Sequence, residues 1–174
     1  MEEYRILDTA QGPVAFVGTE CGVRQIFLPG PTRAQLESRI AERCPGAVEN
    51  PGLLPDLADA LTRYFAGEPV EFHTRIDWRG YSNFEVDVWR ACAKVPYGRT
   101  ASYKALADEL GCPGAARAVG VAMSRNPVAP VVPCHRILKS DGTLGGYSGP
   151  GGLQQKQSLL DMEAAASGAL LVKA

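Results

Sequence analysis

A thiol and an imidazole stand next to each other at Cys134 and His135, and this pair is the strongest candidate for chemistry in the sequence. A cysteine with its reference pKa of about 8.5 is only slightly ionised at neutral pH, so a nucleophilic cysteine needs a base or a positive neighbour. His135 could be that base, and Arg136 adds positive charge. Adjacent side chains on an extended strand point to opposite faces, so contact within the pair requires a turn or a bridging water. For the pair alone, a buried structural cysteine beside a core histidine is the better interpretation, because free cysteine is among the most buried residue types.

Prolines and apolar residues surround the pair. Residues 130–138 read Pro-Val-Val-Pro-Cys-His-Arg-Ile-Leu. These flanks predict that the pair lies inside a pocket or at its lip. The elements that position this segment therefore decide between a reactive and a structural cysteine.

The composition is that of a globular chain that buries a core. Its 174 residues are 45% hydrophobic, which allows one large domain or two small ones. Residues 1–79 hold eight Lys/Arg against twelve Asp/Glu, whereas residues 80–174 hold ten against seven. The resulting net charges of −4 and +3 indicate that the C-terminal half meets an anion.

The cysteines and the N-terminus point to a reducing compartment. The five cysteines are scattered without a C-x-x-C pair, and with two histidines they offer no zinc spacing, so no metal or other cofactor is expected. The N-terminus lacks the pattern of a signal peptide, and no apolar run approaches membrane-spanning length. We therefore predict a cytoplasmic protein with free thiols.

The N-terminal half predicts a small sheet followed by helices. Residues 4–28 contain three short apolar runs separated by Gly and Pro, the pattern of an antiparallel meander. Helices are expected over 32–44, where Thr32 provides an N-cap, and over 55–66. A further strand is expected over 70–76. No residue of this half indicates catalysis.

The C-terminal half predicts a helix-turn-helix. A Ser and a Glu three residues apart cap an expected helix over 82–95, whose apolar face holds Phe84, Val88, Cys92 and Val95. A second helix, capped by Ser102, is expected over 102–110, and a third over 115–123. The Gly-containing break between the last two is typical of a helix-turn-helix.

The helix over 115–123 is unusually bare. Its only charge is Arg117, and its small residues are Ala115, Ala116, Ala118, Gly120 and Ala122. A helix of this kind packs tightly on a neighbour or enters a narrow groove. The minor groove of B-DNA is about half as wide as the major groove, so such a helix could enter it while Arg117 reaches into the base stack.

Taken in order, these segments resemble the O6-alkylguanine-DNA alkyltransferases. The resemblance covers roughly residues 84–163, and the N-terminal half shares only its size and its strand-then-helix order. A four-residue motif would be weak, but an ordered set is specific. The matching residues are Ser102-Tyr103, Ala115-Ala116-Arg117-Ala118-Val119-Gly120, Asn126-Pro127, Pro133-Cys134-His135-Arg136, Gly146-Tyr147-Ser148-Gly149 and Leu159-Leu160-Asp161-Met162-Glu163.

The resemblance implies a monomer with an α/β (α+β) fold in two domains. Residues 1–79 would form a small antiparallel sheet with helices, ribonuclease H-like, and residues 80–174 a winged helix-turn-helix domain that binds DNA and carries the reaction. The linker would fall at Arg79-Gly80.

The resemblance also implies DNA repair by direct reversal, so the protein would be associated with the nucleoid when it acts. O6-alkylguanine, with O4-alkylthymine as a further candidate, would be flipped out of duplex DNA, and its alkyl group would pass to Cys134. His135 would act as the base through a water, and Glu163 would orient its imidazole. Tyr103 would donate to N3 of the leaving guanine. The product is a thioether, which nothing in the sequence could reverse, so each molecule would act once.

The other implied site residues contact DNA or form the pocket. The helix over 115–123, with its small side chains, would lie in the minor groove while Arg117 fills the gap in the base stack. Asn126 would connect the following loop to this helix by hydrogen bonds. The DNA-contacting residues would be Arg117, Ser102, Ala115, Ala116, Ala118 and Gly120. The substrate pocket would be formed by Met123, Asn126, Val128, Ile137, Tyr147, Ser148 and Lys156.

Two departures and two alternatives stay open at this level. Ala129 stands where many relatives carry proline, and the loop over 149–152 is longer than usual, so pocket access could differ. A lesion sensor that binds alkylated DNA without transfer, or with slow transfer, is one alternative, against which Cys134 argues. A cysteine hydrolase is the other, and it leaves the Ala-rich helix unexplained.

Overall fold

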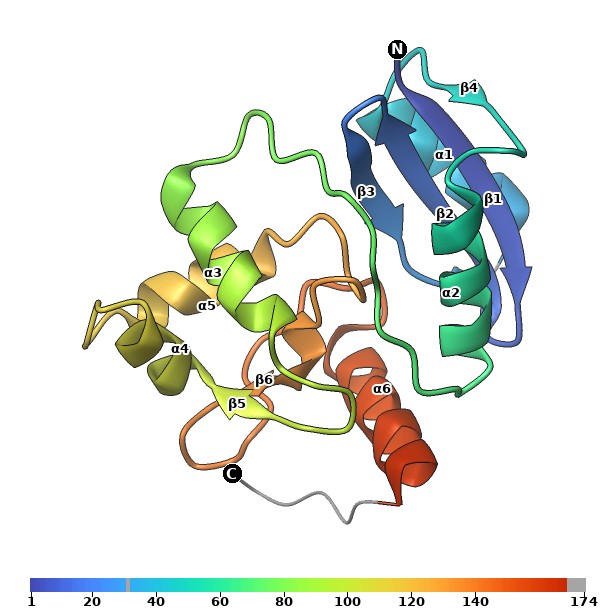
Figure 1. The fold of residues 1–174 in the computed structure, drawn as a ribbon. Coiled ribbons are helices and arrows are strands. Elements are labelled where there is room, and N and C mark those ends of the chain that lie inside the picture. Colours follow the sequence, from blue (N-terminus) through green and yellow to red (C-terminus); the bar gives the residue numbers. More distant parts are fainter. Residues whose placement is uncertain (31, 169–174) are drawn as a thin grey trace. The chain divides into compact units, whose positions relative to one another are not determined.

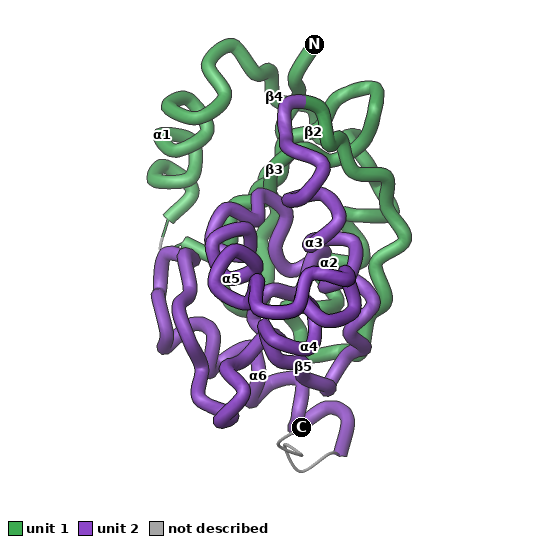
Figure 2. The backbone as a smooth tube through the Cα atoms, turned by 90° about the vertical axis from the view of Figure 1, so that its left-hand side faces the viewer, with its two compact units in different colours: residues 1–79 green, residues 80–174 purple. Residues whose placement is uncertain are grey.

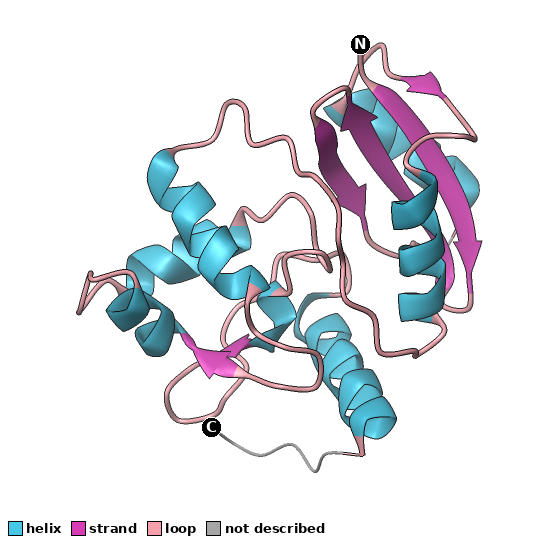
Figure 3. Ribbon diagram, viewed as in Figure 1, coloured by secondary structure: helices cyan, strands magenta, loops and turns pink. Residues whose placement is uncertain are grey.

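The computed structural model describes residues 1–30 and 32–168. The chain divides into two compact units, residues 1–79 and residues 80–174 (Figure 2). The first unit combines a sheet with two helices, whereas the second is mainly helical (Figure 3). In the described part of the chain, no helix has the length and apolar character needed to cross a membrane.

The first unit is built on a four-stranded sheet of order β3-β2-β1-β4. The strands β1 (Glu3–Thr9), β2 (Gly12–Thr19) and β3 (Gly22–Phe27) form the predicted antiparallel meander. The short strand β4 (Val48–Glu49) adds to β1 in parallel and was not predicted. Two residues without an alternating apolar pattern carry too little signal for a strand.

Both helices predicted for this unit are confirmed. They are α1 (Arg33–Arg43), whose N-cap Thr32 accepts from the backbone N–H of Gln35, and α2 (Pro55–Phe65). Their apolar stripes are buried, and those of α1 pack with β2 and β3 in one core. The core residues shared by α1 and the two strands are Ala15, Val17, Phe27, Leu36, Ile40 and Cys44.

The strand predicted over 70–76 is wrong. Within the described residues this segment makes one isolated bridge, between Ile76 and Val23. There the Val23 N–H donates to the Arg75 carbonyl at 2.8 Å. The rest of the segment has no ladder partner there, and its side chains beyond buried Val70 alternate between exposed and half-buried. An alternating sequence makes a strand only where a neighbouring edge offers its backbone groups, which local pattern does not reveal.

The second unit begins with α3 (Asn83–Ala93), and its capping box is confirmed: Ser82 and Glu85 exchange both bonds. The predicted face is only partly right. Val88 and Cys92 are fully buried, but Phe84 is 37% exposed and Val95 follows the end of the helix.

The predicted helix-turn-helix consists of α4 (Tyr103–Glu109) and α5 (Ala116–Ser124), with Ser102 as the N-cap of α4. Both helices contact α3, and the Trp89 indole N–H on α3 donates to the Ala122 carbonyl on α5 at 3.0 Å. Beyond α5 come a 3₁₀ turn (Cys134–Arg136), β6 (Ile137–Leu138) and α6 (Gly152–Ser167) (Figure 1).

Candidate functional site

A two-strand parallel pair brings the candidate residues together. The strand β5 (Ala101–Ser102) pairs with β6, placing Ala101 opposite Ile137 and Ser102 opposite Leu138. Tyr103 follows β5 directly, and the turn that carries Cys134 precedes β6 directly. Because the strands are parallel, Tyr103 and the turn that carries Cys134 lie at opposite ends of this pair, but each strand is only two residues long and both side chains line one pocket.

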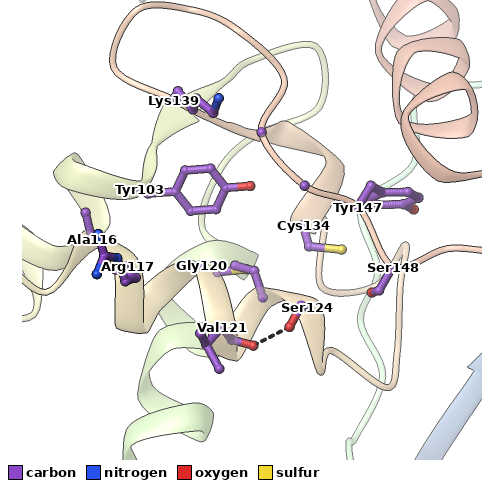
Figure 4. Close-up of a pocket in the computed structure, with 13 residues that line it drawn as sticks. Tyr103, Ala116, Arg117, Gly120, Val121, Ser124, Cys134, Lys139, Tyr147 and Ser148 are labelled. Atoms are coloured by element: carbon purple, nitrogen blue, oxygen red, sulfur yellow. Dashed lines mark hydrogen bonds between the residues drawn. The ribbon is translucent and has the colours of Figure 1, made fainter.

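Cys134 and Tyr103 line a pocket of about 450 Å³, a size typical of sites for small ligands. The helix α5 forms one wall, and the loop after β6 forms the opposite one (Figure 4). The lining residues are Tyr103, Ala116, Arg117, Gly120, Val121, Met123, Ser124, Cys134, Lys139, Gly145, Gly146, Tyr147 and Ser148.

Behind the thiol lies a buried charge network. His135 Nε2 is 2.6 Å from Glu163 Oε1, and both side chains are shielded from solvent. Arg136 donates to both oxygens of the same carboxylate, from Nε at 2.9 Å and from Nη2 at 3.0 Å. Its Nη1 donates to the Val95 carbonyl at 2.6 Å, and the Gly98 N–H donates to Glu163 at 3.1 Å. The carboxylate thus accepts from four donors, and Arg136 compensates its charge.

This network keeps the imidazole neutral and the carboxylate ionised. Burial lowers the pKa of His135 below its usual value, although Glu163 acts in the opposite direction. Burial alone would raise the pKa of Glu163, but its interactions with His135 and then with Arg136 bring that pKa down to about 2. An ionised carboxylate only accepts hydrogen bonds, so Nε2 of the neutral ring carries the proton and Nδ1 has the lone pair.

The Cys134 thiol is buried, and burial raises its pKa. A hydrogen bond from the Asn126 side chain and the positive charge of Lys156 act in the opposite direction. Asn126 itself is held by two bonds: its Nδ2 donates to the Val132 carbonyl at 2.7 Å, and its Oδ1 accepts from the Val128 N–H at 3.0 Å. The resting sulfur is therefore a thiol, and a reaction at this sulfur requires a base.

Tyr103 is paired with a buried lysine. Lys156 Nζ lies 3.3 Å from the Tyr103 hydroxyl and donates to the carbonyls of Ile137 at 2.6 Å and Gly146 at 3.4 Å. Burial lowers the pKa of Lys156 to about 8 and raises that of Tyr103 to about 12. At neutral pH the tyrosine is therefore a protonated donor beside a cation.

Only part of the predicted site faces the pocket. Of the predicted pocket residues, Met123, Tyr147 and Ser148 line it, while Asn126, Val128, Ile137 and Lys156 lie behind the lining and support it. The Asn126 side chain bonds within its own loop, over residues 126–132, while its backbone N–H donates to the Met123 carbonyl of α5 at 3.2 Å and links that loop to the helix. Among the predicted DNA contacts, Ala116, Arg117 and Gly120 line the pocket, whereas Ala115, Ala118 and Ser102 lie outside its lining.

Sequence reasoning missed two cations. Arg136 was interpreted only as a positive neighbour of the pair, although it is buried and holds Glu163 with two bonds. Lys139 lines the pocket and was not singled out. A charged residue inside an apolar run is the signal that could have identified Arg136, because a buried charge needs a partner.

Within the described residues, no group of three or more His, Cys, Asp or Glu side chains is arranged to hold a metal ion. The chemistry that the pocket offers is that of a thiol with a buried base behind it and a phenol across from it.

Comparison with known proteins identifies the family. Residues 83–165 match the family model of the 6-O-methylguanine DNA methyltransferase DNA-binding domain. The methylated-DNA–protein-cysteine methyltransferase of Mycobacterium leprae (strain TN) is 46% identical over 163 residues, which cover 94% of this chain and 93% of that protein. The crystal structure of Mycobacterium tuberculosis OGT in complex with DNA is 38% identical with a TM-score of 0.78, covering 94% of each chain.

A more distant structure agrees with these matches. The O6-methylguanine-DNA methyltransferase of Pyrococcus kodakaraensis strain KOD1 is 26% identical with a TM-score of 0.69, covering 94% of this chain and 99% of that one. The mixed α/β fold predicted from the sequence is therefore confirmed. The chain belongs to the methylated-DNA–protein-cysteine methyltransferases, which repair DNA by transferring an alkyl group to a cysteine of their own.

Proposed function

We propose that Cys134 takes the alkyl group from O6 of guanine in double-stranded DNA, and that each molecule does so once. The observation that carries this proposal is the position of the thiol. It faces a pocket with Tyr103 across from it and the buried His135–Glu163 pair behind it. The family model match lies within residues 80–174, which supports this unit as the DNA-binding and catalytic domain.

The transfer is an in-line displacement at the alkyl carbon. The Cys134 thiol gives its proton to the lone pair on Nδ1 of His135, through a water, and the thiolate forms the new S–C bond as the C–O6 bond breaks. The resulting imidazolium is stabilised by Glu163, which holds Nε2 at 2.6 Å. The electron pair leaves on the guanine, and the Tyr103 hydroxyl protonates or hydrogen-bonds its N3.

The base reaches the pocket by leaving the helical stack, at a cost of a few kcal/mol. The helix α5 presents exposed Arg117 and Ala118 beside half-buried Ala115, Ala116 and Gly120, a narrow surface suited to the minor groove. Arg117 would occupy the gap left in the stack. The crystal structure of the Mycobacterium tuberculosis relative with DNA supports this assignment of a partner. Action as a monomer in the cytoplasm stays a prediction.

Counting transferred groups tests the proposal. The chain would be mixed with an excess of duplex carrying O6-[³H-methyl]guanine, and protein-bound label would be followed with time. We expect one methyl group per chain and then no further reaction. Binding without label would support a lesion sensor, and continuing release of labelled product would support a hydrolase; either result would refute the proposal.

We expect Tyr103→Phe to slow transfer by about 10²-fold, because one donor to the leaving guanine is lost. The measurement is the single-turnover rate with methylated duplex. Tyr4→Phe, which removes the same atom from β1 in the other unit, is the control and should react at the wild-type rate. An unchanged rate in Tyr103→Phe would remove this hydroxyl from the mechanism.

We expect Gly145→Ala to displace Tyr103 and slow transfer by about 10- to 10²-fold. Gly145 has φ +68°, and a Cβ there would lie 3.0 Å from both Cε2 and the hydroxyl oxygen of Tyr103. Gly111→Ala is the matched control, since Gly111 has φ +70° and open space around it. If both variants slow the reaction equally, backbone strain rather than displacement of the ring is responsible.

The dependence of the transfer rate on pH follows from the protonation of His135 and Lys156. His135 accepts a proton only when neutral, and its lowered pKa extends this state to pH values below those of an ordinary histidine, so the rate should fall only in mild acid. Lys156 is charged below its pKa of about 8 and favours the thiolate, so the rate should also fall above that pH. In Lys156→Met the plateau should be lower and the alkaline fall absent. A wild-type rate that keeps rising above pH 8 would contradict this role.

A further inference from the structure

The charged side chains that line the pocket are all positive. Arg117 and Lys139 both line the pocket, and the lining contains no Asp or Glu. The two cations lie on different sides of the Tyr103 ring, Arg117 on α5 and Lys139 on the segment after β6 (Figure 4). Such a lining favours a ligand with negative charge near the pocket.

Lys139 is held by its backbone, and its side chain is exposed. Its N–H donates to the Thr143 carbonyl and its carbonyl accepts from the Gly142 N–H, both at 2.9 Å, which closes a tight turn directly after β6. Within the described residues, Lys139 Nζ forms no ion pair or hydrogen bond. The neighbouring Asp141 carboxylate instead bonds Thr143, through the N–H at 2.9 Å and the hydroxyl at 2.7 Å.

We propose that Lys139 binds a backbone phosphate of the flipped nucleotide and so positions the alkylated base against Cys134. This inference rests on the proposed function. A base whose O6 group meets the buried Cys134 brings its sugar and two flanking phosphates to the outer part of the pocket, because they are covalently attached. Lys139 is the lining cation left for them, since Arg117 is assigned to the base stack.

A lysine suits this position. Its ammonium is a compact charge on a flexible stem, which accepts a phosphate from a range of directions and carries no preference for sequence. Neutralising one phosphate of duplex DNA contributes about 0.9 to the slope of log K against log [salt]. The contribution of Lys139 is therefore measurable separately from overall affinity.

The first experiment compares salt dependences. Binding to a duplex containing O6-methylguanine would be measured at several salt concentrations for Cys134→Ser, which cannot react, and for the same chain with Lys139→Met added. We expect the slope to fall by about 0.9 with Lys139→Met. Lys94→Met is the control: Lys94 is exposed, pairs with Glu109 at 2.9 Å and does not line the pocket, yet its loss changes the net charge equally.

A second experiment locates the phosphate. Duplexes would carry a neutral methylphosphonate in place of one phosphate, either 5′ or 3′ to the lesion. At the phosphate bound by Lys139, this replacement should weaken binding of the lysine-containing chain and have little further effect with Lys139→Met. The proposal would be overturned if the methylphosphonate weakened binding by the same factor with and without Lys139→Met at both positions. It would also be overturned if Lys139→Met left the salt slope unchanged, or if Lys94→Met changed that slope by the same amount.

These outcomes are separate from those of the proposed function. If the wild-type chain transfers no alkyl group, the proposed function fails, while the salt slopes still report whether Lys139 contacts phosphate. If transfer occurs and the slopes of the Lys139→Met and parent chains agree, only the role of Lys139 fails.

Discussion

Replacing Cys134 by serine should abolish alkyl transfer and leave both the fold and the DNA affinity intact. The substitution changes one atom, and the buried hydroxyl can keep the hydrogen bond from Asn126. A serine hydroxyl is a much weaker acid than a thiol, so neutral His135 cannot generate the corresponding nucleophile at a useful rate. The measurements are protein-bound label after incubation with methylated duplex, and duplex affinity by titration.

The matched control is Cys112→Ser, which removes an exposed thiol outside the 3₁₀ turn that carries Cys134. This variant should transfer at the wild-type rate. Residual transfer by Cys134→Ser, or its loss in Cys112→Ser, would mean that the acceptor has been assigned to the wrong cysteine. Loss of DNA affinity in Cys134→Ser would show that the thiol has a structural role as well.

Glu163→Gln should cause the largest combined loss of stability and rate. One carboxylate oxygen accepts from His135 and Arg136, and the other accepts from Arg136 and the Gly98 N–H. An amide in either orientation therefore turns its NH₂ group toward two donors and leaves the buried guanidinium uncompensated. Breaking a buried pair by removing one partner costs about 3–5 kcal/mol.

The same substitution should slow transfer by about 10²–10⁴-fold, because His135 loses the charge that stabilises its imidazolium. Urea unfolding measures the first effect and single-turnover kinetics the second. Glu109→Gln, which breaks the exposed pair with Lys94, is the control and should change stability by less than about 1 kcal/mol. A Glu163→Gln chain with wild-type stability and rate would contradict both the buried network and its role.

The stability effect also has a definite pH dependence. The pKa of Glu163 is lowered to about 2 by His135 and Arg136, so its stabilising contribution is present above the ordinary pKa of a glutamate. It should be lost as the pH falls from that value through about 2. The difference in unfolding free energy between wild type and Glu163→Gln should narrow over the same range.

Elements with strong local signals were predictable from the sequence. The capping box at Ser82 and the cap at Ser102 mark where α3 and α4 begin, because these side chains satisfy backbone groups within three residues. The Gly and Pro residues between the short apolar runs likewise predicted the antiparallel meander of β1 to β3. The resemblance led to the segments that meet at the pocket, although the Cys134-His135 pair by itself favoured a structural interpretation of the cysteine.

Features that depend on distant partners were not predictable. The segment over 70–76 alternates like a strand but finds only one bridge to β3. Arg136 reaches Glu163 because α6 packs against the turn, a contact between residues 27 positions apart. Lys139 faces the pocket because the turn after β6 directs it there. Local pattern contains none of these tertiary contacts.

The central claim is that Cys134 is the alkyl acceptor, and intact-protein mass spectrometry followed by peptide mapping tests it most directly. After incubation with duplex DNA containing O6-methylguanine, we expect each chain to gain the mass of one methylene, located on the peptide that contains Cys134. An unchanged mass, or a methyl group on Cys21, Cys44, Cys92 or Cys112, would contradict the account.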